Sequence, residues 1–190
     1  MTTVELLVIM YGSWANDPEG DERFGRNQRR VEITLNPILP ADFATTDVKH
    51  TSDWHCEFCT KPVQETIWMN ASWLHLTPPR LVSYVHNVCD AGTGPCAEQV
   101  RQLNTYGAGM SGSPLVSVWP PKENEEVQFL LSSSCAFCNN ETEESCQSLQ
   151  RCSKCRLIRY CSIGCQRKDW TRHKMCCKVV QEAKTKWYPE

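Results

Sequence analysis

Residues 152–177 read CSKCRLIRYCSIGCQRKDWTRHKMCC, and they carry the strongest structural signal in the chain. Residue types that bind metal form three short pairs in this stretch, and a Cys-x2-Cys pair at Cys135 and Cys138 precedes them, which makes four pairs. Two-residue gaps suit tight turns that aim both side chains at one ion, and three-residue gaps place ligands on one helix face. Zinc prefers four tetrahedral thiolate and imidazole ligands, so four pairs predict two closed structural sites. The predicted ligands are Cys135, Cys138, Cys152, Cys155, Cys161, Cys165, His173 and Cys177.

The cysteine content of the whole chain favours metal binding over disulfide bonding. The 190 residues include 13 cysteines, an odd number, and several fall in Cys-x2-Cys pairs. Reduced cysteines in this arrangement are typical of the nucleus or cytoplasm, where we expect this protein. No apolar run reaches the roughly 18 residues that span a bilayer, and no basic segment precedes the first apolar run. Neither membrane association nor export is therefore expected.

From Arg159 to Lys174, and again from Leu149 to Cys155, the sequence closely resembles the MYND zinc finger. The resemblance covers residues 135–177, which is under a quarter of the chain. In that family the ligand pairs interleave, the first with the third and the second with the fourth. The resemblance therefore implies one zinc ion held by Cys135, Cys138, Cys161 and Cys165, and another held by Cys152, Cys155, His173 and Cys177.

Two further cysteines leave alternatives in this region. Cys146 lies in the loop between the first two pairs, among acidic residues, and is interpreted as a non-ligand. Cys176 is adjacent to Cys177 and could replace it, although the His-x3-Cys spacing of the family favours Cys177.

The finger also suggests a peptide-binding surface. Gln166 and Trp170 stand four residues apart, on one face of the helix expected here. MYND fingers are protein-interaction modules, and the resemblance implies that this pair holds proline-rich segments of the Pro-x-Leu-x-Pro type. Such segments are already extended and suit aromatic faces. The alternative interpretation is that Trp170 packs against the zinc knuckles as a core residue.

A second group of candidate ligands lies upstream of the finger. A Cys-x2-Cys pair at Cys56 and Cys59 is followed by His86, Cys89 and Cys96, which offers five ligands where one zinc ion needs four. The His-x2-Cys spacing favours Cys56, Cys59, His86 and Cys89 as the ligand set. Alternatively, Cys96 at the start of an expected helix replaces His86, giving four cysteines. The arrangement loosely resembles fungal proteins in which a cysteine- and histidine-containing segment precedes a terminal MYND finger.

These observations predict an α+β fold made of small zinc-stabilised modules. Residues 30–35 alternate polar and apolar and predict a strand, whereas residues 2–11 fit either a helix or a strand. Residues 72–76 and 80–85 predict a hairpin between the upstream ligand pairs, which fits a treble-clef-like module. The predicted organisation is an N-terminal α+β segment with a zinc site at 1–120, a linker at 121–134, the finger at 135–177 and a basic tail at 178–190.

Composition and motifs weigh against catalysis. Leu, Ile, Val and Phe make up only 20% of the chain, which disfavours a large buried core. Some lysine methyltransferases insert a MYND finger into a SET domain, but the upstream sequence shows no counterpart of the SET motifs. A helix start lowers a thiol pKa, yet the sequence places no base beside Cys96. We therefore expect neither an enzyme nor a small-molecule substrate.

Nucleic-acid binding is the second interpretation of function. Residues 151–190 hold eleven Lys and Arg against three Asp and Glu, whereas the whole chain has a formal net charge of −2. Thiolates around zinc offset much of the positive charge of the finger, and few cations remain for binding driven by phosphates. The first interpretation is an adaptor or regulatory protein that binds zinc and proline-rich protein segments, and the alternative is a DNA-binding transcriptional regulator.

Overall fold

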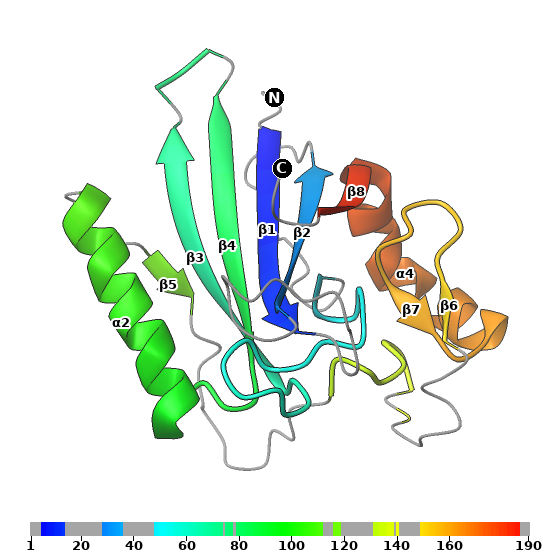
Figure 1. The fold of residues 1–190 in the computed structure, drawn as a ribbon. Helices are drawn as coiled ribbons and strands as arrows, with labels where there is room; N and C mark the ends of the chain where they lie inside the picture. Colours follow the sequence, from blue (N-terminus) through cyan, green and yellow to red (C-terminus); the bar gives the residue numbers. More distant parts are fainter. Residues whose placement is uncertain are drawn as a thin grey trace.

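The computed structural model describes residues 5–13, 28–35, 48–73, 75–77, 79–111, 116–118, 131–138, 140 and 149–186. Six of its strands are β1 Glu5–Ser13, β2 Gln28–Leu35, β3 Glu65–Trp73, β4 Arg80–Val88, β5 Val116–Val118 and β8 Val180–Lys186. They form one sheet in the order β5-β3-β4-β1-β2-β8 (Figure 1). Neighbouring strands are antiparallel except β1 and β4, which are parallel.

In the part of the chain that the structure describes, two long helices and a short hairpin accompany the sheet. Helix α2 spans Gly94–Ser111, and helix α4 spans Ile163–Val179. The hairpin joins β6 Gln150–Arg151 to β7 Arg159–Tyr160 in antiparallel register. In Figure 1, α2 lies to the left of the sheet, and the hairpin with α4 lies to the right.

Alternation along the strands gives the sheet two buried faces. Trp68 of β3 joins one apolar cluster, whereas Ile67 and Met69 on either side of it join another. The first cluster, here the sheet–finger core, contains both sheet and finger residues: Leu6, Val8, Met10, Val48, Trp54, Val63, Trp68, Val85, Cys135, Ala136, Cys152, Cys155, Leu157, Ile158, Tyr160, Cys176 and Cys177. The second, here the α2 core, contains Cys56, Ile67, Met69, Val88, Ala91, Cys96 and Val100.

The mixed α and β fold agrees with the predicted class. Residues that fitted either a helix or a strand form β1, the segment predicted as a strand forms most of β2, and the predicted hairpin is present as β3 and β4. Both β3 and β4 extend beyond the predicted segments: β3 begins at Glu65 and β4 continues to Val88, and the added residues are mostly buried without a simple alternation.

The segments on either side of the predicted finger contact the rest of the structure more closely than a linker and a tail would. Val180–Lys186, expected in a basic tail, forms β8 and pairs with β2, whose edge is otherwise open for hydrogen bonding. The expected linker at 121–134 falls largely outside the described residues, but its end does not behave as a linker. Ser132 and Ser134 are buried, and the backbone N–H of Ser132 donates to the carbonyl of Val63 at 2.9 Å.

Gly12 on β1 lies so close to the ring of Trp54 that only a residue without a side chain fits there. A Cβ atom here would lie 2.6 Å from Cε3 of Trp54, which is fully buried. We expect Gly12→Ala to lower the free energy of unfolding by about 1–3 kcal/mol, because overpacking displaces a core ring. Urea unfolding with zinc in excess measures the change.

Gly109 on α2 provides the matched control for this prediction. A Cβ atom at Gly109 meets nothing within 4 Å, so Gly109→Ala should raise the free energy of unfolding by about 0.5–1 kcal/mol through helix propensity. If Gly12→Ala and Gly109→Ala changed the free energy of unfolding in the same direction, the packing argument for Gly12 would be contradicted.

Candidate metal centres

The most buried group of ligands lies between the β6–β7 hairpin and α4. Atoms of Cys152, Cys155, His173 and Cys177 all lie within 4.8 Å of one another, and all four residues are buried. The sulfur atoms of Cys152 and Cys177 are 3.9 Å apart, and Sγ of Cys155 lies 3.6 Å from Nε2 of His173. Tetrahedral zinc with bonds of about 2.3 Å to sulfur places its ligand atoms about 3.8 Å apart. The printed separations in this group are therefore close to those of a tetrahedral zinc site.

A second finger group lies closer to the surface. Cys135, Cys138, Cys161 and Cys165 lie within the same mutual distance, and Cys138 is exposed. The sulfur atom of Cys161 lies 3.5 Å from those of both Cys138 and Cys165. The structure thus gathers the eight finger residues into the two interleaved sets that the resemblance implied. Cys176 lies outside both sets although it is buried beside Cys177, and Cys146 lies outside the described residues.

Local backbone structure explains how the finger ligands reach these positions. The N–H of Arg156 donates to the carbonyl of Cys152 at 2.9 Å, and Arg156 itself has a φ of 55°, which closes the knuckle turn. At the start of α4, Ser162 is the N-cap, and its hydroxyl accepts from the N–H of Cys165. Further along α4, the buried carboxylate of Asp169 accepts from the hydroxyl of Tyr160 at 2.7 Å, which holds the helix against β7.

Hydrogen bonds prepare one thiol in each finger knuckle for ionisation. Burial alone would raise the pKa of Cys135, but backbone N–H groups, those of Cys138 and Cys161 foremost, donate to its sulfur and lower the pKa from 9.0 to about 7. Burial also opposes ionisation of Cys152, yet the N–H of Cys155 and the ring of His173 help to lower its pKa to about 7. A thiolate is the form that binds metal.

Cys161 and Cys177 favour the neutral thiol as long as only protein groups surround them. Burial raises the pKa of Cys161 to about 12, with a further contribution from the thiol of Cys165. Burial, followed by the charges of Cys155 and Cys152, raises the pKa of Cys177 to about 12. A divalent cation reverses this preference, because a coordinating thiol loses its proton. The donor set therefore suits zinc chemically as well as geometrically.

Three residues that the sequence gave no reason to select attach the finger to the rest of the molecule. Arg159 donates from Nε to the carbonyl of His50 at 3.1 Å and from Nη2 to the carbonyl of Ser132 at 3.0 Å. The Nδ1 of His50 lies 3.2 Å from the same Ser132 carbonyl. Burial, and then the charge of Lys49, lowers the pKa of His50 to about 4, so its ring is neutral at pH 7 and Nδ1 can donate to this carbonyl.

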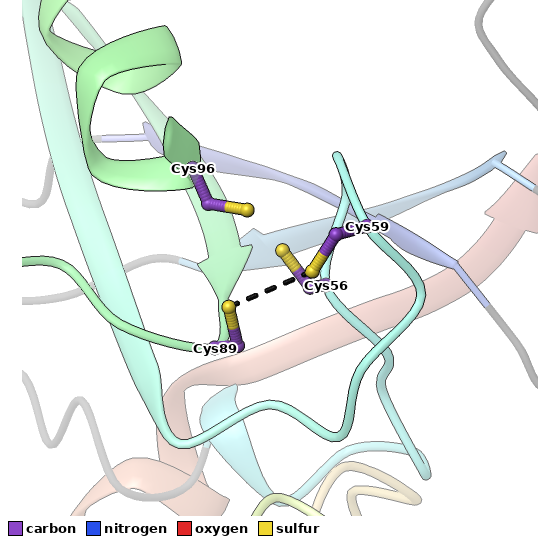
Figure 2. A group of neighbouring side chains, drawn as sticks. All are labelled: Cys56, Cys59, Cys89 and Cys96. Carbon is purple, nitrogen blue, oxygen red and sulfur yellow. Dashed lines mark hydrogen bonds between the residues drawn. The ribbon is translucent and has the colours of Figure 1, made fainter. Parts of the chain in front are cut away.

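The upstream ligand group consists of four cysteines. Cys56, Cys59, Cys89 and Cys96 lie within 4.8 Å of one another, and the expectation that His86 completes this set is wrong (Figure 2). His86 lies within β4, whereas Cys89 follows the end of that strand, and the His86 ring contacts Glu57 and Tyr11 and does not join the four sulfur atoms. Its Nδ1 lies 2.8 Å from Oε2 of Glu57, and its ring stacks on that of Tyr11 with centroids 5.3 Å apart.

The two residues predicted to bind peptide lie on the outer part of α4. Trp170 keeps 43% of its surface exposed, and Gln166 is partly exposed one turn before it. The Trp170 ring also meets the ring of His173 edge to face, with centroids 6.0 Å apart. Trp170 therefore combines an exposed surface with a contact to a candidate zinc ligand, so both interpretations of this residue have a structural basis.

None of the helices that the structure describes is long and apolar enough to cross a membrane. No solved structure matches the chain.

Residues 135–177 match the family model of the MYND finger. One similar protein is SET domain and MYND-type zinc finger protein 6 of Schizosaccharomyces pombe, 46% identical over 54 residues, which cover 28% of this chain and 10% of that protein. Human histone-lysine N-methyltransferase SMYD3 is 43% identical over 44 residues, which cover 23% of this chain and 10% of that protein. Mouse Tudor domain-containing protein 1 is 47% identical over 36 residues, covering 19% of this chain and 3% of that protein.

These matches concern a small part of each protein. The chain spans a tenth or less of the length of the three relatives named here, and the matches to SET-domain proteins fall in the MYND region. The comparisons show that the chain carries a MYND finger, a zinc-binding domain that mediates protein–protein interaction.

Proposed function

We propose that this chain is a non-catalytic adaptor of the nucleus or cytoplasm whose MYND finger binds proline-rich segments of a partner protein. The observation that carries the proposal is the position of Trp170, half-exposed on α4 and one turn after Gln166. A proline-rich segment presents a rigid, extended surface that an exposed aromatic face can contact at low entropic cost.

The contact with His173 supports this role for Trp170. Because the indole ring meets a candidate zinc ligand at its edge, zinc binding fixes the position of the ring before any ligand arrives. A pre-ordered ring loses little conformational freedom on binding. The side-chain amide of Gln166 offers both a donor and an acceptor for backbone groups of an extended ligand.

The cysteine clusters support a binding role over a catalytic one. Each holds four ligand atoms, so a zinc ion within it has no open position for water or substrate. Cys96, which a helix start could have activated as a nucleophile, belongs to one of these clusters. In the proposed function, zinc contributes folding energy and leaves recognition to the side chains around it.

Trp170→Ala should abolish most of the affinity for a proline-rich peptide without releasing zinc. We expect at least a tenfold increase in Kd for a synthetic Pro-x-Leu-x-Pro peptide, since loss of an aromatic contact costs about 1.5 kcal/mol or more. Isothermal titration calorimetry gives the affinity, and metal analysis of the same sample gives the zinc content.

Met175→Ala is the matched control, because Met175 is 65% exposed on the same helix but five residues away, on a different face. It should bind the peptide as the unmodified chain does. Loss of zinc from the Trp170→Ala variant would assign Trp170 a structural role, and unchanged affinity would place the ligand elsewhere.

Nucleic-acid binding remains the alternative because α4 also exposes Arg167, Lys168 and Lys178. In an electrophoretic assay with duplex DNA, a shift that is lost on raising salt and lost when these three residues are replaced by Ala would favour it. The same triple variant should still bind the proline-rich peptide if the finger acts as proposed.

A further inference from the structure

Four cysteines from three separate segments meet at the end of β4 (Figure 2), and they pack in the α2 core, which contains no residue of the MYND finger. Cys56 and Cys59 come from the turn that precedes β3, Cys89 directly follows β4, and Cys96 is the third residue of α2. The sulfur atoms of Cys59 and Cys89 are 3.6 Å apart, close to the separation of about 3.8 Å between thiolates on tetrahedral zinc. This separation is far too long for a disulfide bond, which measures about 2.05 Å.

The turn that carries Cys56 and Cys59 has the backbone of a finger zinc knuckle. Thr60 follows the second cysteine with a φ of 62°, and its N–H donates to the carbonyl of Cys56 at 3.2 Å. In the finger, Arg156 follows Cys155 with a φ of 55° and donates to the carbonyl of Cys152. These are the only residues other than glycine with positive φ in the described part of the chain. Both therefore mark the same turn around a Cys-x2-Cys pair.

The order of elements around the upstream group repeats that around the outer finger site. In the finger, the knuckle of Cys135 and Cys138 precedes the β6–β7 hairpin, Cys161 directly follows β7, and Cys165 is the third residue of α4. Upstream, the knuckle is followed by the β3–β4 hairpin, a cysteine directly after the second strand, and a cysteine as the third residue of the helix. The two segments place four sulfur atoms on equivalent elements in the same order.

We propose that Cys56, Cys59, Cys89 and Cys96 bind a third zinc ion in a closed, four-thiolate site that anchors α2 to the β3–β4 hairpin. The site is independent of the peptide surface on α4. Its ligand set contains Cys96 in place of His86, and His86 instead supports the knuckle through its contact with Glu57.

The burial of α2 explains why this anchor matters. The buried residues among the described side chains of α2 are Cys96, Ala97 and Val100, all in its first two turns. Further along, Leu103 and Tyr106 are 41% and 71% exposed. The apolar contact of α2 with the sheet is therefore short, and a metal ion at its N-terminal end supplies the attachment that the α2 core lacks.

Metal content of the full chain, produced with zinc present, tests the proposal. We expect three zinc ions per chain for the unmodified protein, two for Cys56→Ser combined with Cys59→Ser, and three for His86→Gln. Two zinc ions in the unmodified protein, or three in the double variant, would overturn the third site. Loss of one zinc in His86→Gln with full retention in Cys96→Ser would overturn the ligand set.

Two further measurements keep the test decisive. In the double variant, backbone amides of α2 should lose protection from hydrogen exchange. The Kd for the proline-rich peptide should stay within twofold of that of the unmodified chain. If the amides of α2 kept their protection, the metal ion would not anchor this helix. If the double variant does not fold, the unmodified chain is titrated with Co2+, and thiolate charge-transfer absorption should rise until three equivalents are bound. Saturation at two equivalents would remove the site whether or not the finger binds peptide.

Discussion

Replacing Cys152 and Cys155 by serine should unfold the six-stranded sheet together with the finger. Both residues are buried in the sheet–finger core, where they pack with apolar residues of β1, β3 and β4. In addition, β8 begins at the residue after α4 ends, so the helix that carries His173 continues directly into the sheet. A structural zinc ion contributes about 10–16 kcal/mol in small zinc domains, as much as the 5–15 kcal/mol that typically separates folded from unfolded states.

Hydrogen exchange at the amides of β1 and β4 measures this coupling. In the Cys152→Ser, Cys155→Ser variant, we expect their protection to fall to that of an unfolded chain, and the urea transition to be lost. Cys176→Ala provides the control, because Cys176 lies in the same core but outside the three metal groups. It should keep its zinc and lose only about 1–2 kcal/mol of stability. Full protection of β1 and β4 in the double variant would show that the finger folds independently.

The finger ligands could be predicted from the sequence because the information is local. A Cys-x2-Cys turn and two ligands four residues apart on a helix determine where their side chains point, and the family resemblance supplied the interleaving. The fourth upstream ligand could not be chosen this way. The spacing of His86 and Cys89 looks like a ligand pair only if both lie in a turn, whereas the structure continues β4 through His86 to Val88 and starts α2 at Gly94.

The attachment of the finger to the sheet could not be predicted, because it depends on contacts between residues that are distant in the sequence. Val180–Lys186 has the composition of a solvated tail, and only the edge of β2 makes it a strand. The polar run before Cys135 looked like a linker for a similar reason. Its serines are buried because Trp54, His50 and Arg159 satisfy their backbone and hydroxyl groups. Such pairings involve partners that no local pattern identifies, so the sequence predicted separate modules where the structure has a shared core.

Arg159→Met should weaken this shared core far more than the same change at Arg151. The two arginines face each other across the β6–β7 hairpin, so they share a strand environment and differ in burial. Arg159 is 8% exposed and donates to the carbonyls of His50 and Ser132, whereas Arg151 is exposed and donates to the carbonyl of Arg156 within its own hairpin. Methionine keeps the apolar stem of either residue but removes the donors.

We expect Arg159→Met to lower the free energy of unfolding by about 3 kcal/mol, because hydrogen bonds from a charged group are lost and the buried carbonyl of His50 loses its guanidinium donor. Arg151→Met should cost less than about 1 kcal/mol, since solvent can replace its contact. Urea unfolding with zinc in excess compares the two, and metal analysis checks that neither variant loses zinc. If the two variants lost the same free energy of unfolding, the apolar residues of the sheet–finger core alone would hold the finger on the sheet. The polar contacts of His50, Ser132 and Arg159 would then fix the position of the finger without adding stability.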